Sequence, residues 1–241
     1  METQVSPIRK LAIMGGTFDP IHIGHLVTAE EVRHEFGIDE VLFVPTGHPP
    51  HKSHMNMTTS EHRYLMTVLA TAENPNFKVS RLEIEREGIT YTVDTIKELK
   101  KIYGDKVKIY FITGADAVQK ILTWKSPEEL LTLCDFVAVT RPGYQKHELI
   151  AYVEELKRKY EANIHFLEVP ALAISSSNIR ERINEMKPIK YLVPAEVENY
   201  IKKYNLYEYK ICLTEAQRQA MYDYVATKLS PKRYAHTKGV V

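Results

Sequence analysis

Residues 15–26 read GGTFDPIHIGHL, a stretch that places two glycines, a proline and two histidines near the start of the chain. It follows the apolar run KLAIMG at residues 10–15, which predicts a buried strand. The apolar spacing of HLVTAEEVRHEFG at residues 25–37 predicts a helix. The stretch is therefore the turn from the first strand into the first helix, and ligands of open α/β sheets bind at such turns.

The residue types in this turn favour a phosphate as the ligand. Gly15 and Gly16 predict a backbone that takes positive φ and comes close to a ligand. A helix beginning near Ile23 offers unpartnered N–H groups and the positive end of its dipole. His22 and His25 face the same side and can donate to one phosphate. A plain turn with surface histidines stays open, whereas zinc is disfavoured because no cysteine or HExxH pattern accompanies them.

Composition excludes several classes of function. Of the 241 residues, 44% are hydrophobic and 26% charged, as in ordinary globular proteins. The net charge of +1 gives no general attraction to a polyanion, so we expect no nucleic-acid partner. Neither cysteine, Cys134 or Cys212, belongs to a CxxC pair, and the opening METQVSPIRK lacks the apolar core of a signal peptide. No apolar run approaches about 20 residues, so we expect a cytoplasmic protein without a membrane partner. Nothing in the composition indicates an oligomeric state.

Apolar runs alternate with amphipathic ones along the chain, which predicts a doubly wound, mainly parallel α/β sheet. The expected strands are residues 10–15, 41–46, 77–85, 107–114, 136–143 and 164–169. The expected helices are residues 25–37, 59–73, 91–104, 115–124, 147–162, 175–186 and 194–207. The last two helices have no strand between them and give a helical C-terminal part. We expect one domain over residues 1–206 and a helical tail over 207–241.

Several motifs together resemble a known family. GGTFDPIHIGHL and ISSSNIRERI at residues 174–183 resemble the T/HxGH and ISSTxIR signatures of nucleotidyltransferases in the class I aminoacyl-tRNA synthetase-like superfamily. GHPPHK at 47–52, REGITYTVDTI at 86–96 and ITGADAVQKILTWK at 112–125 narrow the resemblance to bacterial nicotinate-nucleotide adenylyltransferases. The resemblance covers residues 8–206 and implies a Rossmann-like nucleotidyltransferase fold.

The resemblance implies transfer of the adenylyl group of ATP to nicotinic acid mononucleotide, with release of pyrophosphate, in NAD biosynthesis (EC 2.7.7.18). The attacking phosphate is already ionised, so no general base is needed and catalysis rests on positioning and charge neutralisation. Mg²⁺ is expected with ATP. Because Mg²⁺ prefers phosphate oxygens and water, we expect no metal ligand from the protein.

The resemblance also assigns residues. Catalytic roles are implied for His22, His25, Lys52 and Arg180. Contacts to ATP are implied for Gly15, Gly16, Thr17, Phe18, Gly114, Asp116, Arg141, Ser175, Ser176 and Ser177. Contacts to the nicotinate part are implied for Tyr91, Thr92 and Trp124. Taken alone, the serines also fit a helix N-cap, Lys52 a solvated loop lysine and Trp124 a core residue.

The tail resembles a different family. YVATKLSPKRYAHTKGVV resembles the opening of an HD-domain metal phosphohydrolase, with His236 in the place of the first metal ligand. The later His-Asp pair is absent from the sequence, and one histidine cannot hold a catalytic metal, so we expect no hydrolase activity. An ordinary C-terminal helix is the alternative.

Other functions are weighed against the same motifs. Adenylyltransferases acting on phosphopantetheine and cytidylyltransferases share the HxGH turn but lack the ITYTVDT and GAD…W pair. A nucleotide-sensing module with a decayed site would carry a broken HxGH or SSSNIR element, and both elements are intact. Hydrolysis of dinucleoside polyphosphates is disfavoured by the missing His-Asp pair.

Overall fold

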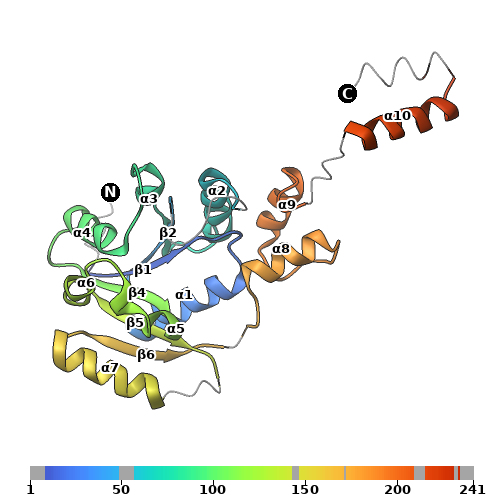
Figure 1. The fold of residues 1–241 in the computed structure, drawn as a ribbon. Coiled ribbons are helices and arrows are strands. Elements are labelled where there is room, and N and C mark those ends of the chain that lie inside the picture. Colours follow the sequence, from blue (N-terminus) through green and yellow to red (C-terminus); the bar gives the residue numbers. More distant parts are fainter. Residues whose placement is uncertain are drawn as a thin grey trace, which may run out of the picture. The chain divides into compact units, whose positions relative to one another are not determined.

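Six strands form one sheet in the computed structural model, which describes residues 9–48, 57–142, 147–170, 172–208, 215–230 and 233. The strands are β1 (Lys10–Gly16), β2 (Glu40–Pro45), β3 (Phe77–Val79), β4 (Lys108–Gly114), β5 (Asp135–Thr140) and β6 (Ile164–Glu168). They run parallel in the order β3-β2-β1-β4-β5-β6 (Figure 1). The predicted doubly wound α/β fold is confirmed, and the order reverses between β1 and β4.

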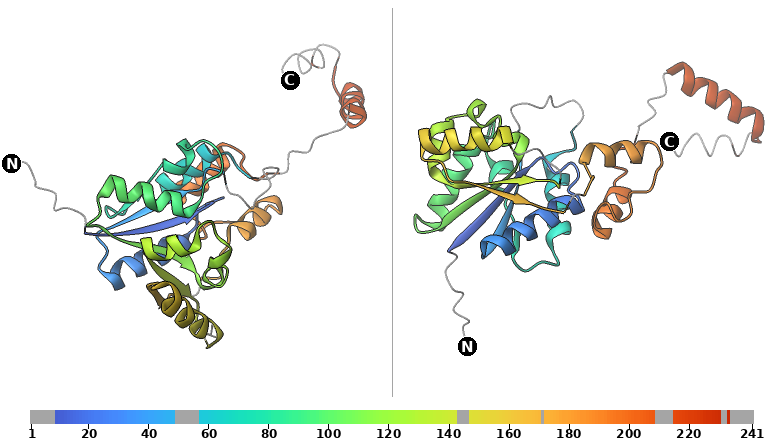
Figure 2. Two further views of the ribbon diagram at one scale, coloured as in Figure 1. Left: turned by 60° about the vertical axis from the view of Figure 1, so that its left-hand side comes forward. Right: turned by 90° about the horizontal axis from the view of Figure 1, so that it is seen from below.

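Helices connect the strands and cover both sides of the sheet (Figure 2). They are α1 (Ile23–Phe36), α2 (Ser60–Thr71), α3 (Leu82–Glu85), α4 (Thr92–Tyr103), α5 (Ala115–Val118), α6 (Pro127–Leu133), α7 (His147–Tyr160), α8 (Ser176–Asn184), α9 (Ala195–Lys203) and α10 (Glu215–Lys228), with a short 3₁₀ helix η2 (Ile121–Thr123). Gly104 ends α4 with a φ of 87°, as a glycine after a helix does.

Alternate residues of each central strand face opposite sides of the sheet and build two cores. In β1, Leu11 and Ile13 pack with apolar residues of α4, α6 and α7. Ala12 and Met14 pack on the other side with residues of α1, α2, α8 and α9. Both faces are covered, which explains the continuous apolar runs of the strands. α9 packs beside α2, so the helical C-terminal part belongs to this second core.

The expected strand 77–85 is wrong beyond Val79. The hydroxyl oxygen of Ser80 accepts the N–H of Leu82 at 3.1 Å, and LEIE then forms the single helical turn α3. A turn of this type, closed by a serine hydroxyl, competes with an extended backbone. The alternating apolar residues of LEIE led to the prediction of a strand instead.

The expected helix 115–124 is also divided, into α5 and η2. Its buried residues Ala115, Val118 and Ile121 recur every three residues, a spacing that fits 3₁₀ geometry better than a continuous α-helix. α6 was not predicted, although Pro127 at its first position is a recognised start signal.

The chain divides after Tyr207 into two compact units, residues 1–207 and 208–241. In the second unit the structure describes α10, where Met221 and Tyr224 are exposed. His236, the candidate metal ligand, lies outside the described residues. Within the described parts of the chain, no helix is both long enough and apolar enough to cross a membrane.

Gly47 follows β2 and provides a test of the packing at this edge. An added Cβ there would lie 2.0 Å from the carbonyl oxygen of Glu83, a backbone atom that cannot turn away. We expect Gly47→Ala to lower the free energy of unfolding by about 1–3 kcal/mol, the range for overpacking. Urea denaturation measures it. Gly114→Ala is the control, since nothing lies within 4 Å of its added Cβ, and an equal loss there would contradict the packing explanation.

Candidate active site

The turn after β1 does not use its glycines in the predicted way. Neither Gly15 nor Gly16 has positive φ; in this turn Phe18 does, with φ of 50°. A Cβ on Gly16 would lie 2.9 Å from the Phe18 ring, and one on Gly15 would lie 3.5 Å from the Phe111 ring. The expectation about backbone freedom is therefore wrong. Gly16 must be small because the Phe18 ring packs against it, whereas the contact of a Cβ on Gly15 with Phe111 would be an ordinary one.

His22 and His25 form a stacked pair at the start of α1. Their ring centroids are 3.7 Å apart and the ring planes are inclined by 28°. The backbone N–H of His22 donates to Nδ1 of His25 at 3.2 Å, so the proton of a neutral His25 resides on Nε2. Nδ1 of His22 is buried and has no hydrogen-bond partner among the described residues. A Cβ on Gly24 would lie 3.1 Å from Cε1 and Nδ1 of His22, which explains the glycine between the histidines.

Both imidazoles are neutral at pH 7. Burial, aided by the positive charge of Arg141, lowers the pKa of His22 from 6.5 to about 4. Burial, aided by His22, lowers the pKa of His25 from 6.5 to about 3. The rings can therefore stack without charge repulsion. They can donate hydrogen bonds to an anion, while the positive charge of the site comes from arginines.

The prediction of free N–H groups at the start of α1 is only partly correct. The N–H of Ile23 donates to the carbonyl oxygen of Leu192 at 3.0 Å, and that of His25 donates to the carbonyl oxygen of His22 at 2.9 Å. The protein thus satisfies these two donors itself. Side chains rather than these amides are available to an anion.

The second motif, at the start of α8, is bound to this turn. Ser176 donates to the carbonyl oxygen of Pro20 at 2.8 Å, and Arg180 donates to that of Asp19 at 2.6 Å. Ser175 is the N-cap of α8 and accepts the N–H of Asn178 at 3.2 Å. The serine N-cap and the contact to the HxGH turn therefore occur together.

A pocket of about 880 Å³ lies between these two motifs, at the carboxyl ends of β1, β4 and β5. This is the point where the strand order reverses, the usual ligand site of doubly wound sheets. Ten predicted residues line it: Gly15, Thr17, His22, His25, Gly114, Arg141, Ser175, Ser176, Ser177 and Arg180.

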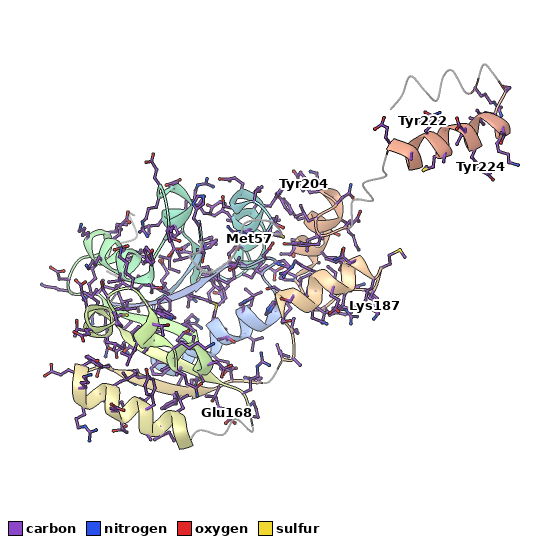
Figure 3. All side chains as sticks on the ribbon, viewed as in Figure 1. Met57, Glu168, Lys187, Tyr204, Tyr222 and Tyr224 are labelled. Atoms are coloured by element: carbon purple, nitrogen blue, oxygen red, sulfur yellow. The ribbon has the colours of Figure 1, made fainter. Side chains whose placement is uncertain are left out.

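Sequence reasoning missed the apolar wall of the pocket. That wall includes Met14, Val139, Val169, Leu172 and Ile174. Met57, which precedes α2 and is labelled in Figure 3, also lines the pocket. These residues carry no chemical motif. The available signal was position: Met14 and Val139 lie near the carboxyl ends of β1 and β5, and Val169 directly follows β6.

The chain is similar to several known proteins. A cytidylyltransferase-like family profile matches residues 13–182. A Thermoanaerobacter sp. (strain X514) protein named "Probable nicotinate-nucleotide adenylyltransferase" is 60% identical over 199 residues, covering 83% of this chain and 94% of that protein. The protein of that name from Moorella thermoacetica is 56% identical over 198 residues, covering 82% and 91%.

The chain belongs to the nicotinate-nucleotide adenylyltransferase family. Its fold is shared with the solved Plasmodium falciparum nicotinic acid mononucleotide adenylyltransferase complexed with NaAD. The TM-score is 0.68 at 24% identity, and the match covers 83% of this chain and 97% of that one. The HxGH turn and the SSSNIR helix, which line the same pocket, thus belong to one family's set of motifs.

Other predicted residues do not line this pocket. Gly16 and Phe18 lie in the turn but pack inward, and Asp116 is exposed on α5. Thr92 is half-buried at the first position of α4. Lys52 lies outside the described residues.

Trp124 and Tyr91 are also outside the lining of this pocket, and Trp124 contacts Phe111. The half-buried Trp124 ring meets Phe111 edge-on, with centroids 6.1 Å apart, and Phe111 in turn packs against Gly15 of the pocket. Nζ of Lys125 lies 4.4 Å from the centroid of the Tyr91 ring. Trp124 therefore joins a core cluster as well as facing solvent, so both earlier interpretations of it keep support.

The buried imidazoles predict a pH dependence of stability. In the unfolded chain His22 and His25 take up protons below pH 6.5, whereas the folded protein resists until about pH 4 and 3. The unfolded state binds more protons in this window, so stability falls as the pH is lowered from 6.5. The loss approaches about 1.4 kcal/mol per pH unit for each histidine.

Urea denaturation across this pH range measures the slope. Because other groups also titrate, the change in unfolding free energy per pH unit is compared between the wild type and the His25→Asn variant. The slope of the variant should be smaller by the contribution of one histidine. Equal slopes for both proteins would contradict the lowered pKa of His25.

Proposed function

We propose that this chain transfers the adenylyl group of ATP to nicotinic acid mononucleotide within the pocket between the HxGH turn and α8. The observation that carries the proposal is the convergence of His22, His25 and Arg180 on one pocket at the reversal of strand order, in a chain 60% identical to a relative of that name. The phosphate of the mononucleotide attacks the α-phosphorus of ATP, and pyrophosphate leaves.

The chain contributes charge and position rather than a base. Arg141 and Arg180 supply positive charge to the triphosphate, and His25 donates from Nε2. His22 lines the same pocket and stacks on His25, so its ring would lie beside the bound phosphates. Such preorganised donors stabilise the charge that develops in the transition state. Binding of the polyanion favours the protonated imidazoles and raises both pKa values.

The remaining predicted residues complete the proposal. Val139, Leu172 and Ile174 give an apolar wall suited to the flat adenine ring. Tyr91, Thr92 and Trp124 would receive the nicotinate end. Lys52, from the GHPPHK segment, would contact a phosphate.

Mg²⁺ fits this site as a companion of ATP. The carboxylate lining the described pocket is that of Asp19, and it is already engaged: Oδ1 accepts the hydroxyl of Tyr207 at 2.8 Å and Oδ2 accepts the N–H of Thr58 at 3.3 Å. The phosphate oxygens and water would therefore hold the ion, which supplies charge neutralisation when bound.

Three further points belong to the proposal. Residues 1–206 would act as the nucleotidyltransferase domain, supported by the division of the chain after Tyr207. Residues 207–241 would form a helical tail related to the start of an HD domain. The cytoplasmic location also stays a prediction.

The decisive assay follows product formation from ATP and Mg²⁺ with three acceptors in parallel. We expect nicotinic acid adenine dinucleotide and pyrophosphate from nicotinic acid mononucleotide, and less product from nicotinamide mononucleotide. Faster turnover of phosphopantetheine, or hydrolysis of a dinucleoside polyphosphate as the main activity, would reject the proposal.

His22→Ala tests the imidazole pair. Removing this donor should lower kcat at least about 100-fold, the usual scale for a charge-stabilising group. Gly24→Ala is a milder variant of the same test, because its Cβ would lie 3.1 Å from the His22 ring and displace it. Alanine also has a higher helix propensity than glycine. We expect lower kcat without lower thermal stability. Near-normal turnover in His22→Ala would remove this residue from catalysis.

Trp124→Ala tests the nicotinate end. We expect KM to rise much more for the mononucleotide than for ATP, because Trp124 contacts Phe111 but does not line the pocket of the residues proposed to bind the triphosphate. Steady-state kinetics with each substrate varied separately measures the two constants. Equal increases in both would argue that Trp124 serves only the core.

A further inference from the structure

Arg63 is the largest fully buried side chain of the described protein and belongs to the first turn of α2. Its guanidinium donates three hydrogen bonds within the described residues, all to backbone carbonyl oxygens. Nη1 donates to Thr17 at 2.8 Å, Nε to Thr58 at 3.1 Å and Nη2 to Gly47 at 3.4 Å. The fixed fork of donors on one planar group allows it to serve three separate segments.

Stability alone gives a poor reason for this residue. Burial lowers the pKa of the Arg63 guanidinium, with Asp19 and Glu83 as the nearby negative groups that oppose the shift. Burying a charge is costly, and apolar side chains of similar volume often serve a core equally well. The residue is better explained by what its donors hold together.

One of the three acceptors lines the pocket, and a second directly follows a residue that lines it. Thr17 lies in the β1–α1 turn and lines the pocket. Gly47 follows β2, and Thr58 comes directly after the pocket residue Met57. The same turn is fixed from the other side by Arg180, which donates to Asp19. Arg63 thus holds a turn that lines the pocket.

We propose that Arg63 is a positioning residue for adenylyl transfer, because its guanidinium fixes the β1–α1 turn against the two ends of the β2–α2 connection. The inference rests on the proposed function, since it assigns Arg63 to the same pocket. Loss of the fork would let Thr17 and the start of α1 shift relative to the triphosphate. Small displacements of this kind have large kinetic effects.

Arg63→Lys is the first test. A lysine keeps the positive charge, but its ammonium is a compact donor that cannot span three carbonyl oxygens. We expect kcat/KM for ATP to fall about 10- to 100-fold, with a raised KM for ATP. Partial unfolding would lower the amount of active enzyme and hence the apparent kcat, leaving KM unchanged.

Two further variants make the test sharp. Arg63→Met removes the buried charge together with the hydrogen bonds to three carbonyl oxygens, so its melting temperature should fall, and the folded enzyme should also show a raised KM for ATP. Arg182→Lys is the matched control. Arg182 likewise donates to a backbone carbonyl oxygen, that of Pro188 at 2.9 and 2.8 Å, but does not line the pocket. Its kinetics should match the wild type.

Melting temperatures and substrate kinetics of all four proteins decide the matter. An inactive wild type would reject the proposed function itself. An active wild type with wild-type KM for ATP in Arg63→Lys or Arg63→Met would overturn only the positioning role. A raised KM in the folded Arg63 variants, with an unchanged Arg182→Lys, supports it.

Discussion

Two neutral imidazole rings, stacked 3.7 Å apart at the start of α1, are the arrangement on which the site depends. Like charges at that distance would repel, so the pair requires the burial that lowers both pKa values. The backbone of His22 then fixes the protonated nitrogen of His25. The site is therefore a set of oriented neutral donors beside arginines, an arrangement suited to polyphosphate and to a nucleophile that is already ionised.

Keeping those rings in place is the work of residues distant in sequence. The β1–α1 turn is held by Ser176 and Arg180 of α8, by Arg63 of α2 and, through Asp19, by Tyr207. These contacts engage backbone carbonyl oxygens or a buried carboxylate. The turn is therefore restrained from several elements at once, and preorganisation of this kind lets binding energy go into the transition state.

Much of the fold follows from local sequence because parallel strands buried on both faces leave continuous apolar runs. The sheet, most of the connecting helices and the helical C-terminal part were predictable for that reason. Predictions failed where a local turn competed with the apolar pattern, as at Ser80, or where a three-residue spacing resembled a helical one, as at Ala115, Val118 and Ile121. The family motifs predicted ten of the residues that line the pocket. The apolar wall of the pocket was not predicted, because its residues belong to no motif of chemical function.

The sequence by itself determined the order of elements and the chemical types at the turn, because periodicity and motif spacing are properties of the chain. Only the tertiary structure decided the charge state of the histidines, since burial sets their pKa values. It also decided the purpose of the glycines and of Arg63. A Cβ excluded by an aromatic ring, or a guanidinium shared by three carbonyl oxygens, depends on which distant segments the fold brings together.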